Sequence, residues 1–235
     1  MTSLAKAKGI AIPARLDPVD FAFRAGELIA VVGPNGGGKT SLLRALAQVE
    51  DAEGDVWIAG ERLSGLAPNR RSRLVGFLPA SREMVWPIAV RDLVTLGLSD
   101  RATTAVDEAI SKFELGSLAE RRVDCLSTGE RSRALLARMF AAKPRLMLLD
   151  EPLANLDPYW SCKLLDELKV RAKQADSATL VSLHDLSQMQ QFDRVIAIEH
   201  GSVAFDGVPR SFLKSPDFAK VFRLSADALG IAVSF

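Results

Sequence analysis

The chain has 235 residues, of which 30 are Lys or Arg and 29 are Asp or Glu. This near-neutral charge excludes a strongly basic nucleic-acid clamp, so no nucleic-acid partner is expected. Its size and its 48% hydrophobic content favour one globular domain over residues 1–235. Two cysteines are too few for a disulfide framework, and neither an apolar run of about 18 residues nor an apolar leader occurs, so we expect a cytoplasmic chain without a membrane span.

The first third of the chain reads as short strands separated by helices. Glu27–Gly33 is an apolar, β-branched run that ends in glycine and predicts a buried parallel strand. Thr40–Val49 spaces its leucines as a helix does, Gly54–Ala59 alternates like an exposed edge strand, and Leu74–Leu78 predicts a further strand. The basic cluster Arg70–Arg73 is interpreted as a solvated helix face.

The middle of the chain is helical, and strands return after it. Helices are predicted for Val90–Leu98, Thr103–Phe113, Gly129–Ala142 and Pro158–Gln174. Strands are predicted for Leu146–Leu149 and Ala178–Leu183, and a hairpin for Val195–Glu199 with Ser202–Phe205.

This alternation predicts an α/β fold, a mainly parallel sheet with helices on both faces. The helix-only stretch interrupts the alternation, so we expect residues 83–145 to form an inserted helical subdomain. Residues 1–82 and 146–235 would then form the nucleotide-binding core for which the motifs below give the evidence.

A glycine-rich loop joins the first predicted strand to the first predicted helix. It matches the pattern G-x-x-x-x-G-K-[ST], in which amide N–H groups and a helix N-terminus converge on a polyphosphate. Lys39 would reach the β- and γ-phosphates, and the Thr40 hydroxyl would ligate Mg²⁺. A glycine-rich surface turn is the alternative, but the strand-to-helix context favours ATP binding by Gly33, Pro34, Asn35, Gly36, Gly37, Gly38, Lys39, Thr40 and Ser41.

Two adjacent acids, Asp150 and Glu151, follow the predicted strand Leu146–Leu149. The carboxyl ends of parallel strands are where open α/β sheets bind ligands. Asp150 there can hold Mg²⁺, and Glu151 can polarise a water beside the γ-phosphate. An acidic pair after a strand also occurs without function, and the phosphate loop is what favours the catalytic interpretation.

Two further polar motifs have ordinary structural explanations when taken alone. Ser127 or Thr128, followed by Gly129 and Glu130, is a typical helix N-cap with an acid in the first turn. His184 follows a strand, where a histidine is often a hydrogen-bonded structural residue.

The order of all these motifs resembles that of the ATPase subunit of ATP-binding cassette (ABC) transporters over nearly the whole chain. The resemblance implies a P-loop NTPase fold with an N-terminal antiparallel β part, and a head-to-tail homodimer that sandwiches ATP. It implies that Ser127, Thr128, Gly129 and Glu130 contact the ATP of the second copy, that Asp157 lies at the dimer seam, and that His184 acts on the γ-phosphate. Catalysis would then rest on Glu151, His184 and Lys39, with Mg²⁺ on Thr40 and Asp150.

Trp86–Gly97, Ser182–Leu186 and Phe192–Ile196 are similar to importer ATPases that serve iron–siderophore, haem, cobalamin and other metal-chelate uptake. This implies integral membrane permease subunits as partners and a position on the inner face of the cell membrane. The segment Ala80–Val94, with Trp86, is the candidate docking site, and packing inside the subdomain is the alternative for Trp86.

The sequence departs from the family pattern at three positions. Ala80 stands where the family has a glutamine, Thr128 replaces the first glycine of L-S-G-G, and no aromatic residue for adenine occurs near Gly9–Ile12, which leaves Ile10 as a candidate. Ala80 and the missing aromatic residue keep open an ATP-dependent dimerising module with little hydrolysis. Two further alternatives are the ATPase of an exporter, because the sequence does not settle the direction of transport, and a cassette protein that acts on nucleic acid, which the net charge of +1 disfavours.

Overall fold

The computed structural model describes residues 3–84, 86–96, 98, 103–173, 176–226 and 228. Its strands are β1 (Ala5–Ile12), β2 (Leu16–Phe23), β3 (Leu28–Val32), β4 (Glu53–Ile58), β5 (Glu61–Arg62), β6 (Val75–Leu78), β7 (Leu146–Leu149), β8 (Ala178–Ser182), β9 (Arg194–Glu199) and β10 (Ser202–Gly207). Its α-helices are α1 (Lys39–Ala47), α2 (Pro68–Leu74), α3 (Val90–Thr95), α4 (Thr103–Lys112), α5 (Thr128–Ala142), α6 (Pro158–Ala172), α7 (Pro209–Lys214) and α8 (Pro216–Phe222).

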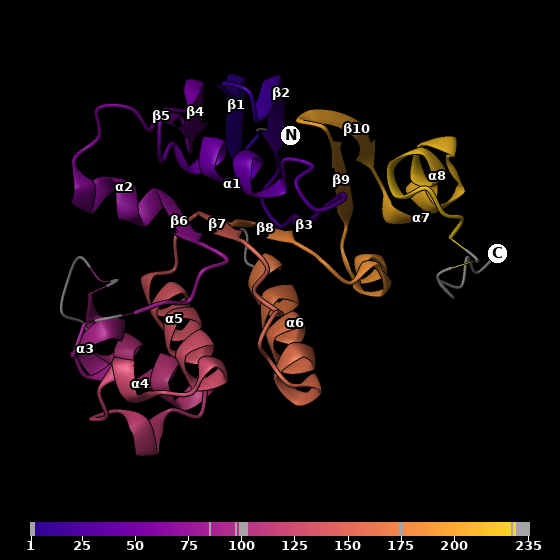
Figure 1. Cartoon of the computed structure of the whole chain (residues 1–235). Coiled ribbons are helices and arrows are strands. Elements are labelled where there is room, and N and C mark those ends of the chain that lie inside the picture. Colours follow the sequence, from indigo (N-terminus) through magenta and orange to yellow (C-terminus); the bar gives the residue numbers. More distant parts are fainter. Residues whose placement is uncertain are drawn as a thin grey trace.

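A six-stranded sheet with the order β10-β9-β3-β8-β7-β6 forms the centre of the molecule (Figure 1). The pairs β9–β3, β3–β8, β8–β7 and β7–β6 are parallel, and only the hairpin strand β10 runs antiparallel to its neighbour. Strands β3, β7 and β8 are buried along their whole length, as the apolar sequences of β3 and β7 and the mainly apolar sequence of β8 predict. The predicted fold class, a mainly parallel sheet flanked by helices, is confirmed.

Each face of this sheet packs into its own hydrophobic core. Along β3, Leu28, Ala30 and Val32 belong to the core beneath helices α5 and α6, whereas Ile29 and Val31 belong to the core around α1. Successive side chains of a strand point to opposite faces, so a doubly covered strand must be apolar at every position. This arrangement fixes the carboxyl end of β3, where the glycine-rich loop begins.

A second sheet is antiparallel, has the order β2-β1-β4-β5, and covers α1 from the side opposite the central sheet. The N-terminal antiparallel β part that the family resemblance implies is therefore confirmed. The prediction that 54–59 is an edge strand is wrong, because β4 pairs with β1 on one side and with β5 on the other. Strand β5 has only two residues and gives little sequence signal.

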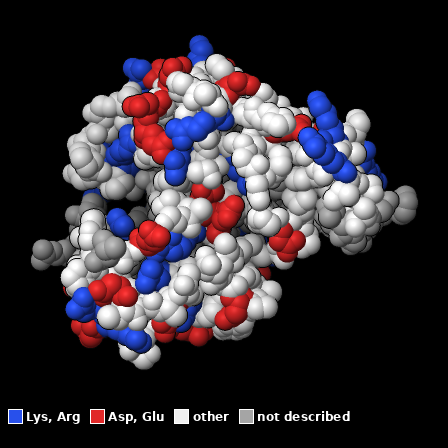
Figure 2. Space-filling view, in the orientation of Figure 1, with Lys and Arg blue, Asp and Glu red and all other residues white. Residues whose placement is uncertain are grey.

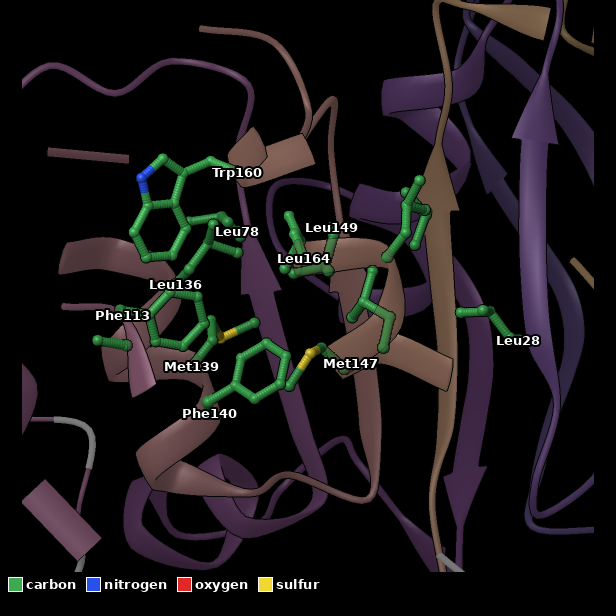
Figure 3. Packing of buried hydrophobic residues seen from close by; sticks show 14 of the residues in the cluster. Leu28, Leu78, Phe113, Leu136, Met139, Phe140, Met147, Leu149, Trp160 and Leu164 are labelled. Atoms are coloured by element: carbon green, nitrogen blue, oxygen red, sulfur yellow. The ribbon is translucent and has the colours of Figure 1, made fainter. Parts of the chain in front are cut away.

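Aromatic and methionine side chains join the helical layer to the sheet (Figure 3). Phe113, next to the end of α4, lies edge-on to Phe140 of α5, with ring centroids 5.1 Å apart, and stacks on Trp160 of α6 at 6.4 Å. Met139 and Met147 fill the space between these rings and the strands. Helices α5 and α6 therefore share one core with the central sheet.

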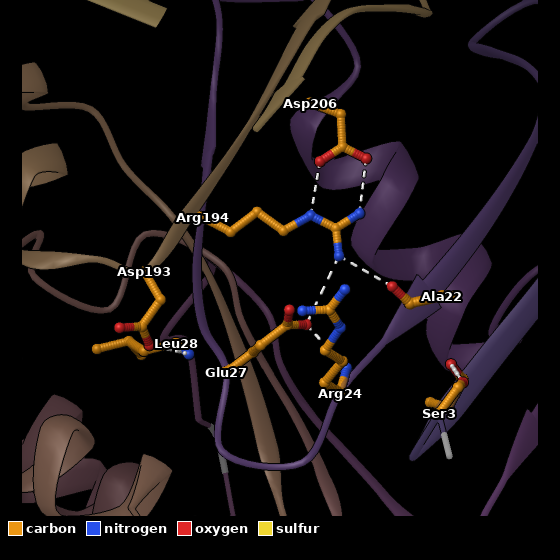
Figure 4. A network of polar contacts seen from close by, with 9 residues as sticks. Ser3, Ala22, Arg24, Glu27, Leu28, Asp193, Arg194 and Asp206 are labelled. Carbon is orange, nitrogen blue, oxygen red and sulfur yellow. Dashed lines mark hydrogen bonds and ion pairs between the residues drawn. The ribbon is translucent and has the colours of Figure 1, made fainter. Parts of the chain in front are cut away.

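Arg194, at the start of β9, ties the two sheets together (Figure 4). Its guanidinium donates to both carboxylate oxygens of Asp206 at 2.6 Å and to the Ala22 carbonyl at 2.9 Å, and it lies 3.5 Å from Glu27. The hydrogen bonds to Asp206 above all, with the nearby Glu27 carboxylate, raise the pKa of Arg194. The contacts join β2, β9 and β10 beside the start of β3.

The basic cluster at Arg70–Arg73 lies on α2, as predicted, but its members differ. Arg70 pairs with Glu61 at the surface, whereas Arg71 is half-buried and donates to the Gln48 carbonyl, at the carboxyl end of α1, at 2.7 Å. Basic and acidic atoms are interspersed over the face in Figure 2.

The other helix predictions hold with shifted ends. Helix α3 ends at Thr95 rather than Leu98, and α6 ends at Ala172 rather than Gln174, which lies outside the described residues. Helices α7 and α8 were not predicted. Among the described residues, the longest helices, α5 and α6, have 15 residues each, and no helix combines the length and the apolarity that crossing a bilayer requires.

Candidate nucleotide site

The glycine-rich loop runs from the carboxyl end of β3 into the N-terminus of α1. The Lys39 ammonium lies inside the loop and donates to the carbonyls of Gly33 at 2.9 Å and Pro34 at 3.1 Å. Burial lowers the pKa of Lys39, and the nearby Glu151 and Asp150 carboxylates oppose this shift. The loop therefore already holds a desolvated cation that a polyphosphate can take over.

Glycine is required where the loop passes strand β9. A Cβ at Gly33 would lie 2.0 Å from the Ile198 carbonyl oxygen, and one at Gly37 would lie 2.9 Å from the same atom. Gly36 and Gly38 adopt positive φ angles of 75° and 114°, which side-chain-bearing residues rarely adopt. The glycines thus serve both close backbone approach and left-handed geometry.

Asp150 joins the loop to the two central strands β7 and β8. It is 1% exposed, and its carboxylate accepts from the Thr40 hydroxyl at 2.8 Å and from the Ser182 hydroxyl at 2.6 Å. Ser182 ends the buried strand β8. Its Oγ also accepts from the Glu151 amide at 2.8 Å, so one serine holds both acids. Sequence reasoning missed Ser182, because the strand sequence ATLVS carries no local signal that its serine meets Asp150.

The pair formed by Thr40 and Asp150 fits Mg²⁺. A hydroxyl and a carboxylate are hard oxygen ligands, and Mg²⁺ commonly takes one or two protein oxygens together with phosphates and waters. Within the described residues no cluster of three His, Cys, Asp or Glu side chains forms a separate metal site. The donor set therefore suits an ion that arrives with a nucleotide.

Glu151 lies on a left-handed turn directly after β7, with φ of 47°. A non-glycine residue there is uncommon and costs about 1–3 kcal/mol of strain unless its surroundings hold it. The Glu151 side chain is half-buried and lines the same pocket as Lys39 and Thr40. The predicted catalytic acid and the phosphate loop therefore share one cavity.

That pocket has a volume of about 590 Å³. Besides Glu151 it is lined by Ala14, Arg15, Leu16, Asp17, Asn35, Gly36, Gly37, Gly38, Lys39, Thr40, Ser41, His200 and Gly201. The prediction that Ile10 holds adenine is wrong, because Ile10 is 0% exposed and packs into the core around α1. Residues Ala14–Asp17, from the turn before β2 and the start of β2, line the pocket instead. Sequence reasoning missed this segment because it carries no aromatic residue.

The residues expected to contact a second copy lie away from this pocket. Ser127 and Glu130 form a reciprocal capping box at the start of α5, which confirms the predicted N-cap. Asp157 caps α6 by accepting from the Trp160 amide at 2.9 Å. A Cβ at Gly129 would lie 3.4 Å from the Asn155 carbonyl oxygen, so the start of α5 lies beside the loop that precedes α6. None of these residues lines the pocket.

His184 follows β8 and is exposed. Because β3 and β8 are parallel neighbours, His184 lies at the same edge of the sheet as the glycine-rich loop. It does not line the pocket that holds Lys39 and Glu151.

A second hollow, of about 390 Å³, opens beside β6. The strand, the segment after it and helix α5 line it, with Phe77, Ser81, Met84, Leu135 and Met139 among its walls. Trp86 does not line this hollow and is 63% exposed, so the alternative that it packs inside a subdomain is wrong.

Comparison with known proteins decides the family. The family model described as "ABC transporter" matches residues 16–154, more than half of the chain. The chain belongs to the ABC transporter family. It is 40% identical over 204 residues to the hemin import ATP-binding protein HmuV of Streptomyces coelicolor, a match that covers 83% of the chain and 72% of HmuV.

Another relative is the cobalamin import ATP-binding protein BtuD of Halobacterium salinarum, 35% identical over 212 residues. That match covers 86% of the present chain but only 53% of BtuD, so this ABC chain spans about half the length of that relative. A dimeric ATP-binding cassette solved with ADP and Pi has a similar fold, with a TM-score of 0.77 at 21% identity, covering 87% of the chain and 98% of that structure.

Proposed function

We propose that this chain is an ATP-hydrolysing subunit that drives a separate membrane permease. The observation that carries the proposal is that Lys39, Thr40 and Glu151 line one pocket, and that buried Asp150 accepts a hydrogen bond from the Thr40 hydroxyl at its wall. A phosphate-binding loop, a Mg²⁺-compatible oxygen pair and a base are the parts that ATP hydrolysis requires.

In the proposed reaction, the loop amides and Lys39 hold the β- and γ-phosphates. Thr40 and Asp150 would hold a Mg²⁺ ion, which would supply positive charge to offset that of the phosphates. Glu151 orients a water in line with the γ-phosphorus and accepts its proton as the P–O bond to ADP breaks. His184 would contact the γ-phosphate from the neighbouring strand end.

A single copy leaves the γ-phosphate open to solvent, so we infer a head-to-tail homodimer. The N-terminus of α5, with Ser127, Thr128, Gly129 and Glu130, would face the ATP of the other copy, and Asp157 would lie at the seam. A 15-residue helix presents a partial positive charge at its N-terminus, which suits a phosphate. Because these residues lie outside the chain's own pocket, a second copy is needed to use them.

We propose residues 83–145 as a helical subdomain on a core of residues 1–82 and 146–235, with the hollow beside β6 as the permease dock. This hollow lies between α5 and the segment after Leu78, and its walls combine apolar side chains with Glu83 and Arg138. A cytoplasmic segment of an integral membrane permease would fill it. The chain would then lie on the inner face of the cell membrane, without crossing it.

The expected cargo is a metal chelate taken up into the cell. HmuV and BtuD are named for hemin and cobalamin import, and both compounds are metal complexes of tetrapyrrole-type rings. The cargo would be recognised by the permease.

One observation favours a second candidate, an ATP-dependent dimerising module with little turnover. Ala80 has no polar side chain to reach the nucleotide where the family has glutamine. Removing one group that stabilises transition-state charge typically lowers the rate about 10²–10³-fold.

Steady-state phosphate release by the purified chain, alone and with its permease in vesicles, distinguishes the two candidates. Wild type should release phosphate, and Glu151→Gln should lower kcat at least about 100-fold with ATP affinity retained, because only the base is lost. If neither protein releases phosphate, either alone or with the permease, the result contradicts the ATPase proposal and favours the dimerising module.

A further inference from the structure

Arg82 is a buried cation that neither the phosphate loop nor the family pattern explains. It is 5% exposed, although arginine is rarely buried without a carboxylate partner. Burial lowers its pKa, against the opposing influence of the Asp150 and Glu151 charges. The burial of this charge therefore needs compensating contacts.

Its hydrogen bonds go to the main chain of the two acids. Nη2 donates to the Asp150 carbonyl at 3.0 Å and reaches the Glu151 carbonyl at 3.4 Å. On the other side, the Asp150 amide donates to the Leu78 carbonyl at 2.9 Å. The segment from Leu78 to Arg82 therefore holds both the N–H and the C=O of Asp150.

The turn held in this way is the strained one. Glu151 has a φ of 47°, and such a conformation persists only where surrounding contacts determine it. Ser182 fixes the Glu151 amide, and Arg82 fixes the two carbonyls around it. The direction of the Glu151 side chain depends on both contacts.

The guanidinium also retains unused donor capacity. Its Nη1 is buried and has no hydrogen-bond partner in the described part of the chain. A buried donor without a partner costs about 1–3 kcal/mol, and more when it is charged. The hydrogen bonds that Nη2 makes to the turn must offset this cost.

The same segment forms part of the wall of the hollow beside β6. Ser81 and Glu83 line that hollow and are exposed, whereas Arg82 between them points inward to the acids. The backbone that carries Arg82 therefore lies between the hollow and the two acids.

We propose that Arg82 is the positioning residue that fixes the Asp150–Glu151 turn for catalysis. The inference rests on the proposed ATPase function, because it assigns to Arg82 the orientation of the catalytic carboxylate.

The test compares Arg82→Met, Arg82→Lys and the control Arg62→Met by ATP turnover and by equilibrium ATP binding. Arg62 is an exposed arginine of the two-residue strand β5, so its replacement makes the same chemical change away from the acids. We expect Arg82→Met to lower kcat about 10- to 100-fold, the range seen when groups that orient a catalytic ligand are lost, with ATP affinity within about threefold of wild type. Arg82→Lys should recover part of kcat, and Arg62→Met should match wild type.

Thermal unfolding separates positioning from general stability. If Arg82→Met does not fold, Arg82→Gln, which keeps a neutral NH₂ donor, becomes the deciding variant, and it should also show lower kcat with ATP binding retained. If the wild type is active and the deciding variant has an unchanged kcat, the role proposed for Arg82 is wrong and the ATPase proposal stands. The role is also wrong if ATP affinity falls as much as kcat does. A wild type without any turnover contradicts the ATPase proposal itself.

Discussion

We propose that Arg15 stacks on the adenine base of bound ATP. It lines the nucleotide pocket from the turn between β1 and β2, and its guanidinium donates to Glu50 at 2.9 Å. A guanidinium is planar and stacks on flat π-systems, so it can replace an aromatic ring. The Glu50 contact would keep it in place.

We expect Arg15→Ala to weaken ATP binding about 3- to 30-fold, because a stacked cation contributes about 0.5–2 kcal/mol. Arg44→Ala is the matched control, since Arg44 also pairs with Glu50 but does not line the pocket. Titration with ATP and with inorganic tripolyphosphate checks the cause: only ATP should bind more weakly. Unchanged ATP affinity in Arg15→Ala excludes this role.

How much of the site the sequence reveals depends on how its residues come together. The phosphate loop and the pair Asp150–Glu151 could be predicted because each is contiguous and follows a strand. Ser182 and Arg82 could not, because each meets the acids only after the strands have paired. Arg15 was missed for another reason: the expected signal was an aromatic residue, and the structure presents a turn instead.

At the scale of elements, long apolar or periodic segments were predicted well and short ones were not. Strands β3, β7 and β8 are buried on both faces, so hydrophobicity alone specifies them. The edge strand was misplaced because β5 pairs with β4 through only two residues. Helices α7 and α8 have six and seven residues, and packing among Phe205, Phe212 and Phe218 stabilises them rather than helical periodicity.

The capping box of α5 predicts a pH dependence. The Glu130 carboxylate accepts from the Ser127 amide at 2.8 Å, and this bond, with that from the Ser127 side chain, lowers the pKa of Glu130. A carboxyl with a lowered pKa in the folded state binds fewer protons there than when unfolded. Its stabilisation is therefore present above the ordinary value of 4.5 and is lost as the pH falls through the lowered pKa.

We expect Glu130→Gln to reduce the free energy of unfolding by about 0.5 kcal/mol at pH 7, because glutamine keeps the hydrogen bond but not the charge at the helix N-terminus. Urea unfolding at pH 7 and at successively lower pH measures this, and the difference from wild type should shrink below about 4.5. Glu53→Gln, on β4, makes the same charge change away from a helix end. A difference that stays constant with pH contradicts the argument.

At the scale of the whole molecule, the proposed dimer needs two parts of the chain that lie at separate places. One is the pocket around Lys39, and the other is the N-terminus of α5 with Gly129, the proposed contact to the ATP of the second copy. The two parts cannot close on the same nucleotide within one copy, because the residues from Ser127 to Glu130 do not line that pocket. ATP bound to one copy must therefore recruit a second copy if both parts are used.

This arrangement predicts that Glu151→Gln, which should bind ATP without hydrolysing it, doubles in mass when ATP and Mg²⁺ are added. Adding Gly129→Leu should abolish the doubling and leave ATP binding intact. A Cβ at Gly129 makes only ordinary contact inside the chain, at 3.4 Å, so the larger side chain projects where the partner's phosphate would lie. Gly116→Leu, at a site where a Cβ meets nothing within 4 Å, is the control and should still dimerise. Light scattering with and without ATP measures the mass. If the Gly129→Leu variant still doubles in mass, the two copies contact each other elsewhere. If Glu151→Gln alone does not double, ATP does not bring two copies together, and the proposed contact of the α5 N-terminus with ATP is wrong.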